Sequence, residues 1–214
     1  MKKHFVITIG REFGSGGRQI GMALAEKLGV KCYDKELLAI AAKESGLSEE
    51  ILNSLDERPT NSFLYSLVMD TYSMGYSTAS YIDMPLNQKA FMAQYDTIKK
   101  LAEEESCIIV GRCADYALKD RDDCFTVFIK ASMDSKIERI SRIYNLPDDK
   151  AKDMITKNNK KRSSYYNFYA NRKWGDSRTY DLCIDSGVLG IDGAVELLSS
   201  YIDIRLNNTD KKGI

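Results

Sequence analysis

Short runs of apolar, often β-branched residues alternate along the chain with longer segments whose apolar residues recur every three or four positions. The short runs predict buried strands, because several of them stop at glycine or aspartate after only four to seven residues. The predicted strands occupy residues 4–9, 30–33, 107–110, 124–130 and 180–185.

The longer periodic segments predict amphipathic helices. A serine at position 48 provides an N-cap for one of them. Residues 59–86, which contain Pro59 and Pro85 and are rich in Ser, Thr, Tyr and Met, have no clear period, and we expect a helical or loop insertion there. The predicted helices cover residues 16–28, 35–44, 87–105, 134–144, 148–169 and 191–206, with another that opens at Ser48.

Strands that alternate with helices predict an α/β fold of three layers, in which a five-stranded parallel sheet has helices on both faces. Ligands of such sheets collect beyond the carboxyl ends of the strands. A glycine-rich loop follows the first predicted strand, Asp34 follows the second, and Gly111 with Arg112 follows the third. We therefore expect the functional site at this edge of the sheet.

The composition disfavours several classes of function. The 214 residues suit a single domain, and 31 basic and 31 acidic side chains give a net charge of zero, which disfavours a general nucleic-acid or membrane-surface binder. The lone histidine and the absence of a C-x-x-C pair argue against zinc. We expect a cytoplasmic protein with no membrane segment and leave open a homo-oligomer. The five cysteines, which we expect to be reduced, are Cys32, Cys107, Cys113, Cys124 and Cys183.

The glycine-rich loop, residues 10–17, holds four glycines in eight residues between a buried strand and a helix. Such a loop can turn successive backbone N–H groups toward a phosphate at a helix N-terminus. The usual P-loop ends in G-K-[ST]. Here Gly17 and Arg18 stand where the lysine would be, and Gln19 or Ile20 stands near the hydroxyl position.

The chain resembles the cytidylate kinase-like family of P-loop proteins at several places along nearly its whole length. The resemblance implies a P-loop NTPase fold with a helical insertion at 59–86, a basic lid at 147–178, ATP or another NTP as donor, and Mg²⁺. The segments that carry it are residues 7–18, 33–38, 110–112, 160–166, 173–175, 180–186 and 189–191.

The resemblance also implies roles for particular residues. Gly14, Ser15, Gly16, Gly17 and Gln19 would cradle donor phosphates, with Arg18 as their nearest cation. Asp34, Arg112 and Lys157 would face the acceptor. The cations expected to neutralise charge during transfer are Arg18, Arg112, Arg142, Lys160 and Arg162, with Arg139 paired to Arg142.

The chain departs from authentic cytidylate kinases at three points: it has no P-loop lysine in register, Cys113 replaces the aspartate after the Gly-Arg pair, and the lid run 157–162 contains no carboxylate. Some residues have a plainer interpretation as well. Asp34 would also serve as a helix cap, Arg112 as a surface ion pair, and the basic run 157–162 as a solvated helix face. The aromatic residues around 165–174 favour packing over base stacking.

The leading functional hypothesis is a kinase that transfers a phosphoryl group from an NTP to a nucleoside monophosphate, CMP-like, or a related small acceptor. The altered loop keeps a second hypothesis open, a catalytically silent nucleotide-binding sensor or regulatory protein. A nucleic-acid-binding module that uses the basic lid is a third, and the zero net charge argues against it.

Overall fold

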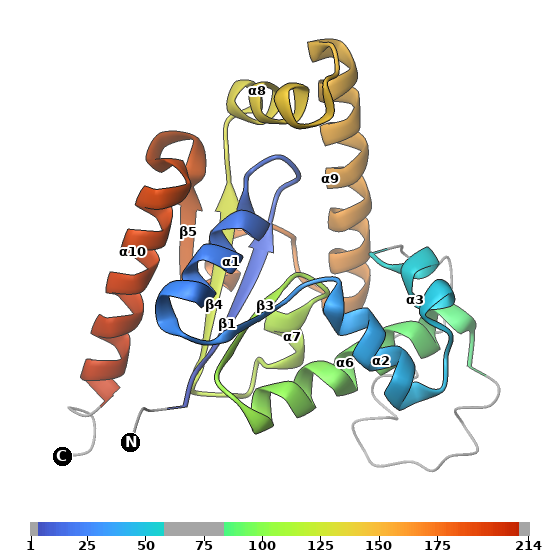
Figure 1. Cartoon of the computed structure of the whole chain (residues 1–214). Coiled ribbons are helices and arrows are strands. Elements are labelled where there is room, and N and C mark those ends of the chain that lie inside the picture. The colour runs from blue at the N-terminus through green and yellow to red at the C-terminus, as the bar shows by residue number, and fades with distance from the viewer. Residues whose placement is uncertain (1–3, 58–83, 210–214) are drawn as a thin grey trace.

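The computed structural model describes residues 4–57 and 84–209 (Figure 1). Most of the predicted insertion at 59–86 lies outside the described residues. Five strands form one all-parallel sheet, as the alternating pattern predicts, and their order is β2-β3-β1-β4-β5. The strands are β1 (Val6–Arg11), β2 (Lys31–Tyr33), β3 (Cys107–Val110), β4 (Cys124–Lys130) and β5 (Leu182–Asp185).

The predicted helices are present, with bounds that shift by a few residues. Ser48 caps α3, because its hydroxyl accepts a hydrogen bond from the Ile51 N–H at 3.2 Å. The short helix α7 has no counterpart in the prediction. The helices are α1 (Gly17–Leu28), α2 (Glu36–Ser45), α3 (Glu49–Leu55), α6 (Leu86–Glu104), α7 (Ala114–Ala117), α8 (Met133–Tyr144), α9 (Asp148–Ala170) and α10 (Ser186–Thr209).

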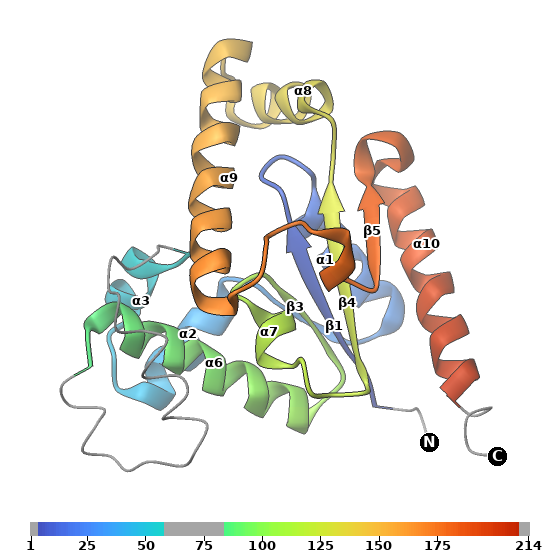
Figure 2. The same ribbon diagram turned by 180° about the vertical axis from the view of Figure 1, so that it is seen from behind.

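Helices cover both faces of the sheet and bury its side chains. Helices α1 and α10 pack together on one face, over a core that includes Ile7, Ile9 and Val127 (Figure 1). Helices α6 and α7 cover the other face, which is the nearer one in Figure 2, and α2 and α3 pack against α6. Alternate residues of β1 therefore face different cores, as the period of a strand requires.

Helix α9 runs beside the sheet. Helix α8 packs against α9 near the end of the sheet where β1 and β4 finish (Figure 2). The last turns of α9 enter an aromatic core in which Tyr169 stacks on Phe91 of α6 with ring centroids 4.0 Å apart. Tyr165 and Tyr166 are buried in the same core. The preference for packing over base stacking is confirmed for these three tyrosines.

Candidate active site

The β1–α1 loop has the backbone that a phosphate cradle needs. Gly14 and Gly16 have φ angles of 85° and 76°, a left-handed region in which a side chain is strained. Helix α1 begins at Gly17 with no side-chain cap and no acidic residue in its first turn. Its first N–H groups have no acceptor inside the helix, so they are suited to bind an anion.

Side chains from α8 hold this loop in place. Lys136 is buried, and its Nζ lies 2.8 Å from Oε2 of Glu12, which also accepts the N–H of Ala131 at 3.2 Å. Arg139 donates to the carbonyl of Gly14 at 3.0 Å. Arg139, expected from the resemblance to act beside Arg142, contacts the backbone of the loop.

Two more side chains tie the loop to other elements. Asn159 of α9 accepts a hydrogen bond from the Phe13 N–H at 2.7 Å. Ser186, at the start of α10, donates to the carbonyl of Ser15 at 2.5 Å. Contacts from α8, α9 and α10 therefore preorganise a loop that would otherwise lose entropy on binding.

Arg112 lies just past β3 and is buried, with a side chain only 2% exposed. Its Nε and Nη2 form a fork on the two carboxylate oxygens of Asp56, at 3.1 and 3.0 Å. Its Nη1 donates to Asp34 at 3.1 Å and to the carbonyl of Val110 at 3.1 Å. Such a planar, two-pronged contact is specific to arginine.

A second carboxylate, Glu57, lies between two further arginines. Nη1 of Arg11, the last residue of β1, is 2.5 Å from Glu57 Oε1, and Nε of Arg162 on α9 is 2.9 Å from Oε2. Nη2 of Arg11 is also 4.0 Å from Asp34. We call the six residues the arginine–carboxylate cluster: Arg11, Arg112, Arg162, Asp34, Asp56 and Glu57.

The cluster perturbs the pKa values of its members. Burial alone would raise the pKa of Glu57, but Arg11, Arg162 and Arg112 outweigh it and hold that pKa well below its ordinary range. Burial lowers the pKa of Arg112, and the carboxylates of Asp56, Glu57 and Asp34 raise it by more. Both groups are therefore charged at neutral pH, inside a largely buried ionic network.

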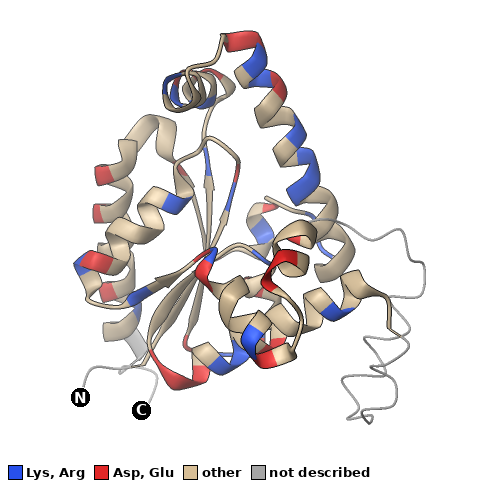
Figure 3. Ribbon diagram, turned by 45° about the vertical axis from the view of Figure 1, so that its right-hand side comes forward, with Lys and Arg blue, Asp and Glu red and all other residues tan. Residues whose placement is uncertain are grey.

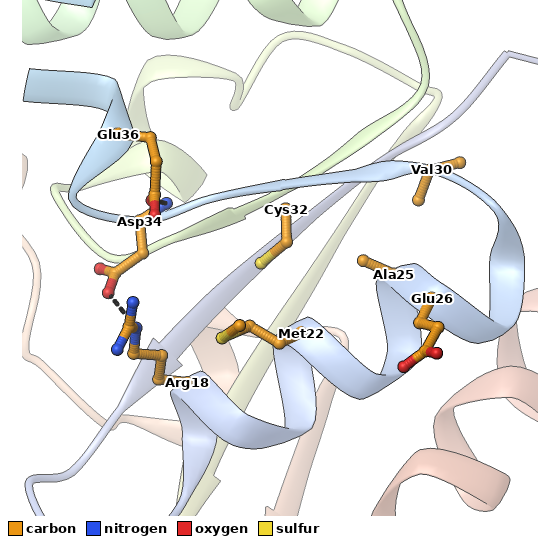
Figure 4. Close-up of a pocket in the computed structure, with 8 residues that line it drawn as sticks. All are labelled: Arg18, Met22, Ala25, Glu26, Val30, Cys32, Asp34 and Glu36. Atoms are coloured by element: carbon orange, nitrogen blue, oxygen red, sulfur yellow. Dashed lines mark hydrogen bonds and ion pairs between the residues drawn. The ribbon is translucent and has the colours of Figure 1, made fainter. Parts of the chain in front are cut away.

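Asp34 joins this cluster to α1. Its Oδ2 is 2.8 Å from Nε of Arg18, whose side chain is 52% exposed (Figure 4). The pair stands at one end of a pocket of about 210 Å³ between α1 and β2, which Met22 and Cys32 also line. No side chain caps α2, so the interpretation of Asp34 as a helix cap is wrong.

A further buried carboxylate, Asp115, lines the same small cavity as Arg112. Asp115 of α7 accepts a hydrogen bond from the Tyr166 hydroxyl at 2.5 Å, and burial raises its pKa. Arg11 and Arg162 also line this cavity. Cys113, which stands where cytidylate kinases have aspartate, is buried, and burial raises the pKa of its thiol.

The structure brings only some of the predicted cations together. Arg112 and Arg162 are in the cluster and Arg18 is at its edge, so Arg112 is no surface ion pair. Figure 3 shows that lysines and arginines also lie along the rest of α9. Four predicted residues are exposed and line none of the pockets described above: Gln19, Arg142, Lys157 and Lys160.

A pocket of about 270 Å³ opens beside the cluster, between α9 and the region of α2 and α3. Lys161 and Arg162 line it from α9, Lys35 lines it from the start of α2, and Asp56 and Glu57 line it from beyond α3. The face of α9 that meets this pocket is therefore one residue away from the predicted Lys157 and Lys160.

Sequence reasoning missed several charged residues of the site. Arg11 had a detectable signal, since it directly follows a buried strand inside the glycine-rich loop. Asp56 and Glu57 had none, because only the fold brings the end of α3 to the ends of β1 and β3. Lys136 and Asp115 lie in helices, where nothing in the local pattern marks a buried charge.

Mg²⁺ is implied by the family, and the side chains at the loop do not fit a protein-held ion. When Gly16 is aligned with the second glycine of the P-loop pattern, the cationic Arg18, and not the expected Gln19 or Ile20, falls on the position of the hydroxyl ligand. The carboxylates of the cluster are already paired with guanidinium groups. Within residues 4–57 and 84–209, no group of three or more His, Cys, Asp or Glu side chains is arranged for a metal.

The same described residues contain no helix that is long and apolar enough to span a bilayer. All five cysteines are free, as the sequence predicts.

Known proteins resemble the chain over most of its length. The cytidylate kinases of Archaeoglobus fulgidus and Methanosarcina mazei are each 26% identical to it, over 96% and 92% of this chain and 99% and 96% of those proteins. The cytidylate kinase of Methanocaldococcus jannaschii is 30% identical over 107 residues, which are 49% of this chain and 60% of that protein.

Solved structures share the fold. An uncharacterized protein from Eubacterium ventriosum matches with a TM-score of 0.70 and 33% identity, over 94% of this chain and 99% of that one. A shikimate kinase from Bacteroides thetaiotaomicron matches with a TM-score of 0.53 and 18% identity, over 93% and 98%. At 18% identity, that second likeness concerns the fold alone.

The strand order, the glycine-rich loop and these structural neighbours define a P-loop NTPase fold of the kind found in small kinases. The sequence model of the cytidylate kinase-like family matches residues 6–188, most of the chain. The chain belongs to the cytidylate kinase-like family.

Proposed function

We propose that the protein is a kinase that transfers the terminal phosphoryl group of ATP or another NTP to a nucleoside monophosphate, CMP-like, or a related small acceptor. The observation that carries the proposal is the arginine–carboxylate cluster. It gathers three arginines near the carboxyl ends of β1 and β3, the edge of the sheet where ligands bind in this kind of fold. Phosphoryl transfer requires positioning and neutralisation of charge, which arginines at this edge supply.

In this proposal the N–H groups at the start of α1 bind the donor phosphates. An oxygen of the acceptor attacks the terminal phosphorus, the bond to the bridging oxygen breaks, and the nucleoside diphosphate leaves with the electron pair. Arg112 and Arg162 hold the anionic acceptor and the phosphoryl group in line. When bound, Mg²⁺ would be carried by donor phosphates and water.

The second candidate is the silent nucleotide-binding sensor. It is favoured by the lack of a P-loop lysine in register and by Arg18 near the hydroxyl position, since both changes remove groups used in turnover. Such a protein would bind an NTP without transferring its phosphoryl group.

The proposal is tested by measuring the melting temperature of the protein in the presence of ATP, GTP or CTP. Each nucleotide is added alone and together with each nucleoside monophosphate or shikimate, with and without Mg²⁺. A ligand that binds only the folded state raises the melting temperature. The kinase proposal expects an NTP and one acceptor to stabilise together by more than either does alone. Stabilisation by an NTP with none by any acceptor supports the sensor, and no shift with millimolar ligand rejects both.

A further inference from the structure

Two of the places where the loop departs from the P-loop pattern are related to each other. When Gly16 is set at the second glycine of G-x-x-x-x-G-K-[ST], position 11 falls on the first glycine and position 17 on the lysine. The chain has Arg11 at the first of these positions and Gly17 at the second. Glycine and cation have thus exchanged places.

The structure gives a steric reason for the exchange. A Cβ built on Gly17 would lie 2.5 Å from Cβ of Arg11 and 3.1 Å from its Cγ, so a side chain at position 17 cannot coexist with Arg11. The stem of Arg11 fills the space from which a P-loop lysine would start. At the other end, a Cβ on Gly111, whose φ is 79°, would overlap Nη1 and Cζ of Arg11.

These two glycines leave a passage for one arginine side chain, from the first turn of α1 to the ends of β1 and β3. The side chain of Arg11 is only 10% exposed along this path, and its guanidinium reaches Glu57 and approaches Asp34. Arg18, in contrast, is half exposed and lies on the flank of α1. Arg11 is therefore the better-placed cation at the cradle.

We infer that Arg11 takes the place of the missing P-loop lysine and binds the terminal phosphates of the donor nucleotide. The inference rests on the proposed function, because it assumes a nucleoside triphosphate at the N-terminus of α1. A guanidinium stays charged at every physiological pH and offers a fork where lysine offers a point charge. Arg11 makes and breaks no bond itself; its charge offsets that of the phosphate oxygens. Glu57, its present partner, is the group with which those oxygens compete.

The test measures binding of ATP, ADP and AMP by calorimetry, with Mg²⁺, to the full chain and to four variants. Arg11→Gly removes the cation, and Arg11→Lys keeps the charge without the fork. Arg11→Gly/Gly17→Lys restores the ordinary order of glycine and lysine. Arg121→Ala, which breaks an ion pair with Asp123 where β4 begins, is the matched control.

We expect Arg11→Gly to weaken ATP binding roughly 10- to 100-fold, the size of one charge-assisted hydrogen bond, and to weaken AMP binding much less. Arg11→Lys and Arg11→Gly/Gly17→Lys regain part of the loss, and Arg121→Ala binds as the wild type does. Wild-type affinity in Arg11→Gly overturns the inference. So does an Arg11→Gly/Gly17→Lys variant that folds and binds ATP no better than Arg11→Gly.

Circular dichroism shows whether each variant is folded. Arg11→Gly leaves Glu57 with Arg162 as its remaining close partner. If Arg11→Gly does not fold, Arg11→Gly/Glu57→Gln is compared with Glu57→Gln, because neither of these variants carries the buried Glu57 charge. Equal ATP affinity in these two variants overturns the inference. A wild-type chain that binds no nucleotide refutes the proposed function itself, before any variant is measured.

Discussion

Replacement of Arg112 by alanine removes the guanidinium that joins Asp34 to Asp56 at the end of β3. Within the described residues, both hydrogen bonds to the Asp56 carboxylate come from Arg112, so that carboxylate loses its partners, whereas Asp34 keeps Arg18 at 2.8 Å. Loss of one partner of a buried pair costs ~3–5 kcal/mol. We expect the lower end of this range, because the side chain of Asp56 is 22% exposed.

For a chain of this length, such a loss lowers the melting temperature by roughly 6–12 °C. The assay is thermal and urea unfolding of the wild type and of Arg112→Ala, Arg112→Lys and Arg112→Ala/Asp56→Asn. Arg112→Lys should fall between the wild type and Arg112→Ala because it keeps the charge but loses the fork, and the double variant should recover part of the loss. Arg178→Ala, which removes an 86% exposed side chain paired with Asp176, is the control and should melt as the wild type does.

If Arg112→Ala melts within about 2 °C of the wild type, the cluster is not a buried network that needs its central arginine. Equal losses in Arg112→Ala and in the double variant would show that the cost arises from a cavity and not from unpaired charge. Either result would refute the electrostatic reasoning.

Three further outcomes follow from other groups. Because the pKa of Glu57 is lowered in the folded state, the Glu57 carboxylate stabilises the protein above its ordinary pKa of about 4.3, and this stabilisation is lost as pH falls below that value. The difference in stability between the wild type and Glu57→Gln should therefore shrink in acid. A difference that does not depend on pH would be contrary evidence. Burial raises the pKa of Asp115, so its ionisation costs stability as pH rises through that pKa; Asp115→Asn, which keeps the hydrogen bond from Tyr166, should melt higher than the wild type at pH 7 and lose this advantage in acid. Gly16→Ala should abolish the ATP-induced rise in melting temperature because the cradle is crowded there, whereas Gly29→Ala, with a similar positive φ and open space around it, should cost only about 1–2 kcal/mol and keep the ATP effect.

The strands of the sheet could be predicted from the sequence because they are buried apolar runs with clear ends. The runs 107–110 and 124–130 coincide with β3 and β4, and the glycines at 16 and 17 mark the start of α1. Arg112 and Asp34 could be assigned to the site because strand ends of a parallel sheet share one edge. Helix α7, with four residues, was too short to show a period.

The sequence was not sufficient for the partners of those residues. The pairing of Asp56 with Arg112 spans 56 positions, and that of Glu57 with Arg162 spans 105, so only the packing of α3 and α9 brings them together. Which of the basic residues on α9 line the pocket depends on their position around the helix. Lys157 and Lys160 line none of the pockets described above, whereas Asn158 and Lys161, each one position further along α9 and therefore about 100° around it, line the pocket beside the cluster. A charge run does not reveal this difference.

Transfer of the terminal phosphoryl group is the most direct test of the proposed function. The wild-type chain is incubated with ATP labelled in its terminal phosphate, Mg²⁺ and each nucleoside monophosphate in turn, and the labelled products are separated. The proposal expects label in one nucleoside diphosphate, CDP first among them, at a rate that Arg112→Lys lowers more than Arg178→Ala does. If ATP binds and no acceptor acquires label, the protein is a nucleotide sensor and the kinase proposal is wrong.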